Sequence, residues 1–211
     1  MKKGIRLLFG MLGASLAIGG TGAGLASEAS AGASLAGELP PGFSLTGQGT
    51  VRDFDFLAGA WTTTQRRLSK RGVGSTQWND APANVHCAIR YMDGVVTAEE
   101  SYSPTGSVSG LFLYSFDIDK HQWSLYWVDP KGGKIDSPLV GGFHGPHGDF
   151  YGDDVEDGRP IKVRYSWTKK DDNHARWEQA FSFDNKSWET NWTTEFTRTD
   201  RATHCKKHDG E

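Results

Sequence analysis

The chain has 211 residues, of which 36% are hydrophobic and 23% are charged, and its formal net charge is −3. This weak negative charge gives no long-range attraction to nucleic acid or to anionic lipid, so we expect neither as a partner. The length leaves room for one domain with a real hydrophobic core after leader and linker segments are set aside.

The first residues have the pattern of a targeting signal. Lys2 and Lys3 precede the apolar run "LLFGMLGASLAIGG", which is too short to span a bilayer as a helix. Small residues follow, and both Ala26 and Ala31 are suitable cleavage positions. The sequence therefore predicts a signal peptide over residues 1–31 and a secreted, periplasmic protein with no integral membrane segment after the signal is removed.

The rest of the chain divides into three parts by composition. Residues 32–50 are small, polar and proline-containing, as in a flexible linker. Residues 51–199 form the predicted domain, and residues 200–211 form a polar C-terminal tail. Cys87 and Cys205 are the two cysteines of the chain, and the sequence leaves open whether they form a disulfide.

Within the predicted domain, segments rich in Val, Thr, Tyr, Phe and Trp alternate with turn signals such as "MDG" and "DPKGGK". Along "ARWEQAFSF", Trp177 and Gln179 fall on one face while Arg176 and Glu178 fall on the other, which is the period of a strand. We predict an all-β fold, an antiparallel up-and-down barrel of about nine or ten strands, with a β-sandwich as the alternative. Only residues 52–60, "RDFDFLAGA", resemble a helical turn, placed before the first strand.

The first predicted strand carries a familiar motif. Gly59-Ala60-Trp61 resembles the G-x-W signature of lipocalin-like, or calycin, barrels. Together with "WSLYWVDP", "GRPIKVRYSW" and "ARWEQAFSFDNKSWETNW", it is similar to a bacterial family of secreted, uncharacterised lipocalin-like domains, over roughly residues 51–199. The resemblance implies a barrel whose floor is closed by Trp61, with Arg198 from the last strand packed across it.

That family has no established activity that would carry over to this chain. In the nitrobindins, a neighbouring calycin group, a histidine on the last strand holds haem. The predicted last strand here, residues 187–199, contains no histidine, so we expect no haem and no other cofactor.

The stretch "HGPHGDFYGDD", residues 144–154, combines histidines with acids and has two interpretations, a metal site or a turn. Zinc needs at least three convergent ligands, and calcium loops have a ligand spacing that this stretch lacks. Gly145-Pro146, between the two histidines, favours a turn. We therefore predict a turn between two strands and no metal.

Aromatic residues are the strongest sign of a binding function, because the chain has eight Trp, six Tyr and eleven Phe. A barrel of the predicted size is wide enough for a filled interior or for one small ligand. Stiff rings with a few polar groups are typical of a ligand pocket, so we predict a cavity for a small apolar or aromatic molecule. The oligomeric state stays open. The predicted lining residues are Trp123, Trp127, Trp167, Trp177, Gln179, Trp188, Asn191 and Trp192.

Two other classes of function stay open at this point. An enzyme on the same barrel, an isomerase, cyclase or lyase, would use His174 or Glu178 to move a proton and Arg164 or Arg176 to steady an oxyanion. For this strand face we favour an ordinary solvated surface, since Trp177 occupies the apolar side. The third class is a structural domain whose core is completely filled.

Overall fold

The computed structural model describes residues 49–205 of the chain. The predicted signal peptide, most of the predicted linker and the end of the C-terminal tail lie outside these described residues. No helix within residues 49–205 combines the length and the apolarity needed to cross a membrane.

The alternating segments form a sheet of 12 strands, and every pair of neighbouring strands is antiparallel. The strands are β1 (Gly59–Leu68), β2 (Trp78–Ala81), β3 (Val85–Tyr91), β4 (Val96–Tyr102), β5 (Val108–Asp117), β6 (Gln122–Asp129), β7 (Lys134–Ile135), β8 (Leu139–His144), β9 (His147–Glu156), β10 (Arg159–Lys169), β11 (His174–Ser182) and β12 (Glu189–Thr199).

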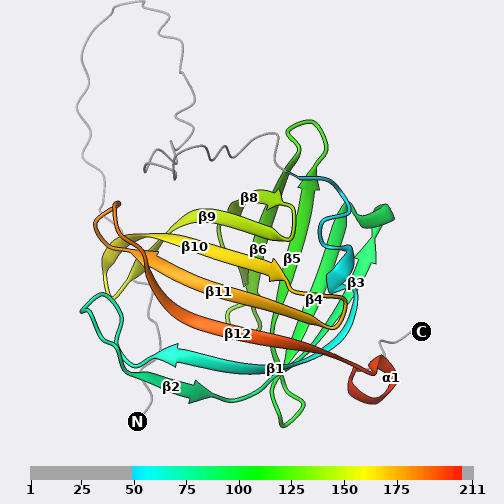
Figure 1. Ribbon diagram of the computed structural model, residues 1–211, viewed down its shortest axis with the longest axis horizontal. Helices are drawn as coiled ribbons and strands as arrows, with labels where there is room; N and C mark the ends of the chain where they lie inside the picture. Colours follow the sequence, from blue (N-terminus) through cyan, green and yellow to red (C-terminus); the bar gives the residue numbers. More distant parts are fainter. Residues whose placement is uncertain (1–48, 206–211) are drawn as a thin grey trace, which may run out of the picture. The chain divides into compact units, whose positions relative to one another are not determined.

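Ten of these strands close into a barrel, in the order β1, β3, β4, β5, β6, β8, β9, β10, β11 and β12, with β12 paired to β1 (Figure 1). Strands that follow one another along the chain are therefore neighbours in the barrel. The predicted up-and-down barrel is confirmed, and the β-sandwich alternative is wrong because a sandwich would leave β1 and β12 unpaired.

The register of the closing strands fixes which side chains face inward. β1 pairs with β12 from Ala60↔Thr199 to Arg67↔Trp192. Side chains alternate along a strand, and Trp61 in β1 is fully buried. The odd-numbered residues of β1 therefore point into the barrel. β2 extends the sheet along the far end of β1, and β7 pairs only with β6.

The segment before β1 closes one end of the barrel. The helical turn predicted for residues 52–60 is present as the 3-10 helix η1 (Asp55–Leu57). Phe54 and Leu57 of this segment are 1% and 0% exposed. The Trp61 indole N–H donates to the carbonyl oxygen of Leu57 at 2.8 Å. This hydrogen bond joins the closing segment to the first strand of the barrel wall.

Arg198 of β12 completes the same end. Its guanidinium carbon lies 4.1 Å from the centroid of the Trp61 ring. The guanidinium also donates to the carbonyl oxygens of Phe56 and Ala58, at 2.7 and 2.9 Å. Arg198 therefore holds three parts of the chain together, namely the last strand, the first strand and the segment before it.

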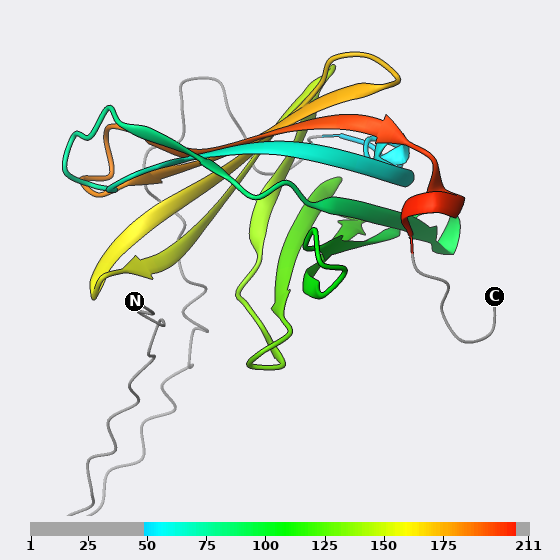
Figure 2. The ribbon, with the colours of Figure 1, turned by 90° about the horizontal axis from the view of Figure 1, so that it is seen from below.

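The C-terminal part of the described chain is fastened to β3. The short helix α1 (Arg201–His204) follows β12, and Asp200 caps it by accepting the Thr203 backbone N–H. Cys205 comes next and forms a disulfide with Cys87 of β3, with Cα atoms 5.8 Å apart. The disulfide that the sequence left open is therefore present. Figure 2 shows α1 and η1 at the same end of the barrel.

Candidate functional site

The barrel interior has two halves that differ in packing. In the half next to η1, the rings contact one another and are almost completely covered, with Trp61 and Trp123 at 0% exposure and Trp167 at 1%. Phe54 lies among them, with its ring centroid 4.5 Å from that of Tyr114 and 4.9 Å from that of Trp123. We call this the sealed half. It is a filled aromatic core that stabilises the fold by burial.

The other half keeps exposed aromatic surface on its inner face. By register, Phe112, Trp127, Tyr165 and Trp192 point inward, yet each remains partly exposed. Trp177, 6% exposed, has its ring centroid 4.9 Å from that of Tyr165 and 5.2 Å from that of Trp192. We call these five residues the lumen rings. Inward rings that retain exposed area border solvent-accessible space, since a filled core would cover them.

The lumen rings stand on two separate walls. Phe112 and Trp127 lie on the neighbouring strands β5 and β6, with ring centroids 4.6 Å apart. Tyr165, Trp177 and Trp192 lie on β10, β11 and β12. In the strand order, β8 and β9 separate the two groups on one side, and β1, β3 and β4 separate them on the other. The two groups therefore do not lie on adjacent strands.

A few polar groups with fixed orientation accompany the lumen rings. The Trp192 indole N–H donates to Gln65 Oε1 at 3.0 Å, and Gln179 Nε2 donates to Asn191 Oδ1 at 2.9 Å. Gln65, Gln179 and Asn191 are all buried. Many rings with a small number of oriented polar groups are the usual composition of a small-molecule site.

A largely buried polar chain that sequence reasoning missed runs from Asn84, just before β3, across β3, β4 and β5. Its members are Asn84, Ser101, His86, Glu99 and Tyr114, which we call the β3–β4 polar chain. His86 Nδ1 lies 2.6 Å from Glu99 Oε1, and the Tyr114 hydroxyl donates to the other carboxylate oxygen. Burial first, and then the charge of Glu99, raise the pKa of Tyr114 well above its ordinary value.

One sequence signal pointed to this chain. Glu99 and Glu100 are adjacent on a strand, so their side chains must point to opposite faces. One of the two therefore had to face the barrel interior, where a carboxylate needs partners. The sequence did not show that the partner would be His86, because the contact depends on the pairing of β3 with β4.

The side chains predicted for acid–base catalysis lie on the outer face of β11. Arg176 and Glu178 alternate with the inward-facing Trp177, and the Arg176 guanidinium lies 2.8 Å from the Glu178 carboxylate. His174 is 53% exposed and its Nδ1 lies 2.9 Å from Asp171. Arg176 and Glu178 form an ion pair on the surface, whereas His174 pairs with Asp171 instead, and none of the three faces the lumen.

The predicted lining residues are divided among three places. Trp127, Trp177 and Trp192 are lumen rings, whereas Trp123 and Trp167 belong to the sealed half. Trp188 packs against Tyr151 on the outer face, with ring centroids 5.7 Å apart. Arg164, the other predicted catalytic arginine, lies over the same indole, with its guanidinium carbon 5.1 Å from the ring centroid.

The histidine-rich stretch is a hairpin. His144 and His147 face each other as the paired ends of β8 and β9, and Gly145-Pro146 connects them with φ +60 at Gly145. The predicted turn is therefore confirmed. His147 Nε2 lies 3.3 Å from Asp149 Oδ1, and this hydrogen bond raises the pKa of His147 above its ordinary value. Within residues 49–205, no three His, Cys, Asp or Glu side chains converge to hold a metal.

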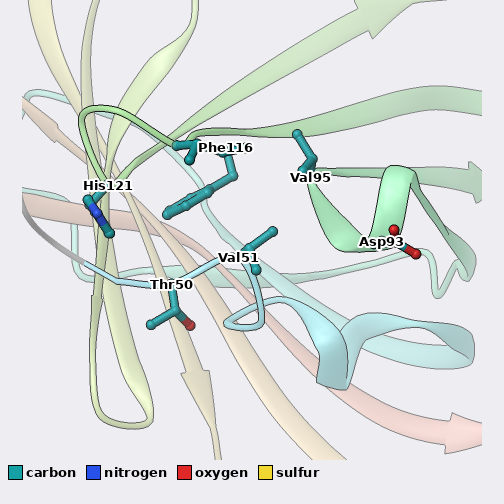
Figure 3. A pocket seen from close by; sticks show the side chains of 7 residues that line it. Thr50, Val51, Asp93, Val95, Phe116 and His121 are labelled. Carbon is teal, nitrogen blue, oxygen red and sulfur yellow. The ribbon is translucent and has the colours of Figure 1, made fainter.

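A pocket of about 360 Å³ lies at the η1 end of the barrel, and none of the lumen rings lines it (Figure 3). It is bordered by the segment before η1, by the 3-10 helix η2 (Met92–Gly94) and by the turn between β5 and β6. Its lining residues are Thr50, Val51, Asp93, Val95, Phe116, Ile118 and His121. The lining is largely apolar and lacks a convergent set of hydrogen-bonding groups that would orient a ligand.

Comparisons with known proteins assign the chain to no family. No protein-family model and no curated protein matches the chain. Among the solved structures that are similar is a redesigned β-barrel, which is 11% identical, covers 72% of this chain and 100% of its own length, and gives a TM-score of 0.39.

Proposed function

We propose that the protein binds one small apolar or aromatic molecule between the lumen rings. The observation that carries this proposal is the contrast within the barrel, where four of the five lumen rings retain exposed area, all but Trp177, and the rings of the other half are covered. Affinity would come from buried apolar surface, at roughly 25 cal/mol per Å². The hydrogen-bonded amides beside the rings would set the orientation of the ligand.

Gly110 supports this proposal because it keeps Trp127 against its own wall. A Cβ atom at Gly110 would overlap the six-membered ring of Trp127. With glycine there, the six-membered ring of the indole lies over Gly110 of β5 and beside Phe112. A side chain in place of this glycine would push the indole into the space between the walls.

Titration with 1-aminoanthracene, a small aromatic fluorophore, tests the proposal. We expect saturable quenching of Trp fluorescence, with binding weakened about tenfold or more in Trp127→Ala, because a wall ring is lost. Trp78→Ala is the matched control, since Trp78 of β2 lies beside Arg66 of β1 and outside the lumen. The proposal fails if quenching does not saturate, or if Trp78→Ala weakens binding as much as Trp127→Ala.

We also propose that the protein acts outside the cytoplasm as a lipocalin-like binder. Support comes from the basic start and apolar run of the sequence, from the Cys87–Cys205 disulfide and from the contact of Arg198 with Trp61. The intact mass of protein recovered from the periplasm of a bacterial host tests this proposal. We expect an N-terminus created by cleavage after Ala26 or Ala31, and full-length protein confined to the cytoplasm would contradict it.

A further inference from the structure

The β3–β4 polar chain contains a serine, a histidine and a carboxylate in sequence. His86 Nδ1 lies 2.6 Å from Glu99 Oε1, and His86 Nε2 lies 3.4 Å from Ser101 Oγ. Ser101, His86 and Glu99 are 3%, 7% and 1% exposed. A base that is oriented by a carboxylate and faces a hydroxyl is the arrangement that activates a nucleophile, and the outer hydrogen bond is often long in empty sites.

The neighbours of the three residues fix the direction of the hydrogen bonds. Tyr114 donates its hydroxyl proton to Glu99 Oε2, as expected of an ionised carboxylate that accepts at both oxygens. The ring nitrogen Nδ1 of His86 then donates to Glu99 Oε1. In the neutral ring, Nε2 is left as an acceptor facing Ser101. Asn84 Nδ2 donates to Ser101 Oγ at 2.9 Å, so a hydrogen-bond donor is already in place beside the serine oxygen.

Ser101 borders the lumen. In the pairing of β4 with β5, Ser101 lies opposite Gly110, and the Trp127 ring packs over that glycine. An apolar group held between the lumen rings therefore lies next to the wall that carries Ser101. A carbonyl group attached to such a ligand would therefore approach the polar chain from the side of Ser101, which is 3% exposed.

We propose that Ser101 is a nucleophile that hydrolyses esters of small aromatic or apolar carboxylic acids, with His86 as its base and Glu99 as the positioning residue. This inference rests on the proposed binding of an apolar group in the lumen. Ser101 Oγ attacks the ester carbonyl carbon and its proton passes to His86 Nε2. The bond from carbon to the alcohol oxygen then breaks, and the alcohol leaves with that proton. Water, deprotonated by His86, then attacks the acyl carbon. The bond from that carbon to Ser101 Oγ breaks, His86 returns the proton to Ser101, and the acid is released.

The alternative to a nucleophilic serine is a purely structural role for the same residues. A buried polar chain whose members are all hydrogen-bonded can simply hold β3, β4 and β5 together. In that case Ser101 would have the low reactivity of any buried hydroxyl. The sequence around Ser101, "EESYS", lacks the G-x-S-x-G elbow of α/β-hydrolases, so the inference depends on the geometry alone.

Labelling with an alkyl fluorophosphonate, followed by intact-mass and peptide mapping, tests the proposal. We expect one adduct on Ser101, and hydrolysis of p-nitrophenyl benzoate that falls at least about 100-fold in Ser101→Ala and in His86→Gln. Ser166→Ala is the matched control, because Ser166 is also a buried serine bonded to a carboxylate, that of Asp149, and should leave both readouts unchanged. No adduct, or an adduct that persists in Ser101→Ala, would overturn the proposal.

Glu99→Gln separates positioning from structure. It keeps the shape of the side chain and loses the charge, so we expect slower labelling in a protein that is still folded, with a normal circular dichroism spectrum. Binding of 1-aminoanthracene to Ser101→Ala separates this inference from the proposed function. Wild-type protein that binds 1-aminoanthracene but is not labelled by the fluorophosphonate would refute the esterase alone. Wild-type protein that shows neither binding nor labelling would refute the lumen as a binding site.

Discussion

Two arginines stack on indoles at opposite ends of the barrel, and they differ in their other contacts. Arg198 lies over Trp61 and also donates to two backbone carbonyls of the segment before β1. Arg67 lies over Trp192, with its guanidinium carbon 3.5 Å from the ring centroid. The planar fork of arginine matters at the first position because several acceptors are fixed there.

Substitution by lysine should therefore have unequal effects at the two positions. Arg198→Lys is expected to lower the free energy of unfolding by about 2–3 kcal/mol, since lysine keeps the charge but cannot reach both carbonyls. Arg67→Lys should lower it by less than about 1 kcal/mol. Urea unfolding of both variants checks this, and equal losses would contradict the role given to Arg198.

The contribution of His147 to the stability of the β8–β9 hairpin depends on pH. Hydrogen bonding to Asp149 raises the pKa of His147 above the ordinary value of 6.5 in the folded protein. The stabilisation is therefore fully present below about pH 6.5 and is lost as the pH rises through the folded-state pKa. Because the side chain is 48% exposed, the effect should be only a few tenths of a kcal/mol.

Urea unfolding at pH 5.5 and at pH 8.5 measures this contribution as a difference between proteins. The wild type should lose slightly more stability than His147→Gln between the two pH values, because glutamine does not titrate. A larger loss in the variant would show that the sign is wrong.

At the scale of elements, the last described residues hold the end of β12 to β3. The disulfide joins Cys87 to Cys205 across 118 residues of sequence. Cross-linking a chain over so long a loop stabilises the fold mainly by restricting the unfolded state. Cys205 itself follows α1, outside the barrel wall, so its removal leaves no cavity in the core.

Cys205→Ser should therefore keep the barrel intact but unfold at lower urea, with a loss of about 2–4 kcal/mol. Adding reductant should produce a similar loss in the wild type and no further loss in the variant. Urea unfolding with and without dithiothreitol makes the comparison. Identical midpoints for oxidised and reduced wild type would contradict a structural disulfide.

Strands β5 and β6 are in close contact where the Trp127 ring of β6 lies over Gly110 of β5. Gly110→Ala should cost about 1–3 kcal/mol, because the new methyl group displaces the Trp127 ring. The cost should become much smaller in the Trp127→Ala background, where the ring is absent. A double-mutant cycle measures this coupling, and additive effects would show that the two residues do not meet.

The alternation of apolar and polar residues predicted the strands, but it could not predict where along the barrel axis a residue would lie. Trp123 and Trp127 lie four residues apart on the same face of β6. The first is 0% exposed in the sealed half, whereas the second is partly exposed in the lumen. The difference arises from η1, which covers one end only, and the position of η1 is a tertiary feature.

At the scale of the whole molecule, the closing of the barrel determines which side chains face inward, and this limits the functional predictions that the sequence allows. The period of two predicted β11 and placed Arg176 and Glu178 opposite Trp177, as the structure has them. Which of these faces is the inner one depends on the pairing of β12 with β1, which no local pattern contains. The contact of His86 with Glu99 likewise joins two strands, and so it was not visible in either segment alone.

The NMR signals of the tryptophan indole N–H groups test the central claim most directly. The claim is that the half of the barrel opposite η1 holds an open, ring-lined lumen. Titration with 1-aminoanthracene should shift the signals of Trp127, Trp177 and Trp192 and leave those of Trp61 and Trp123 in place. Unchanged lumen signals at saturating ligand, or shifts confined to indoles on the outer face, would contradict it.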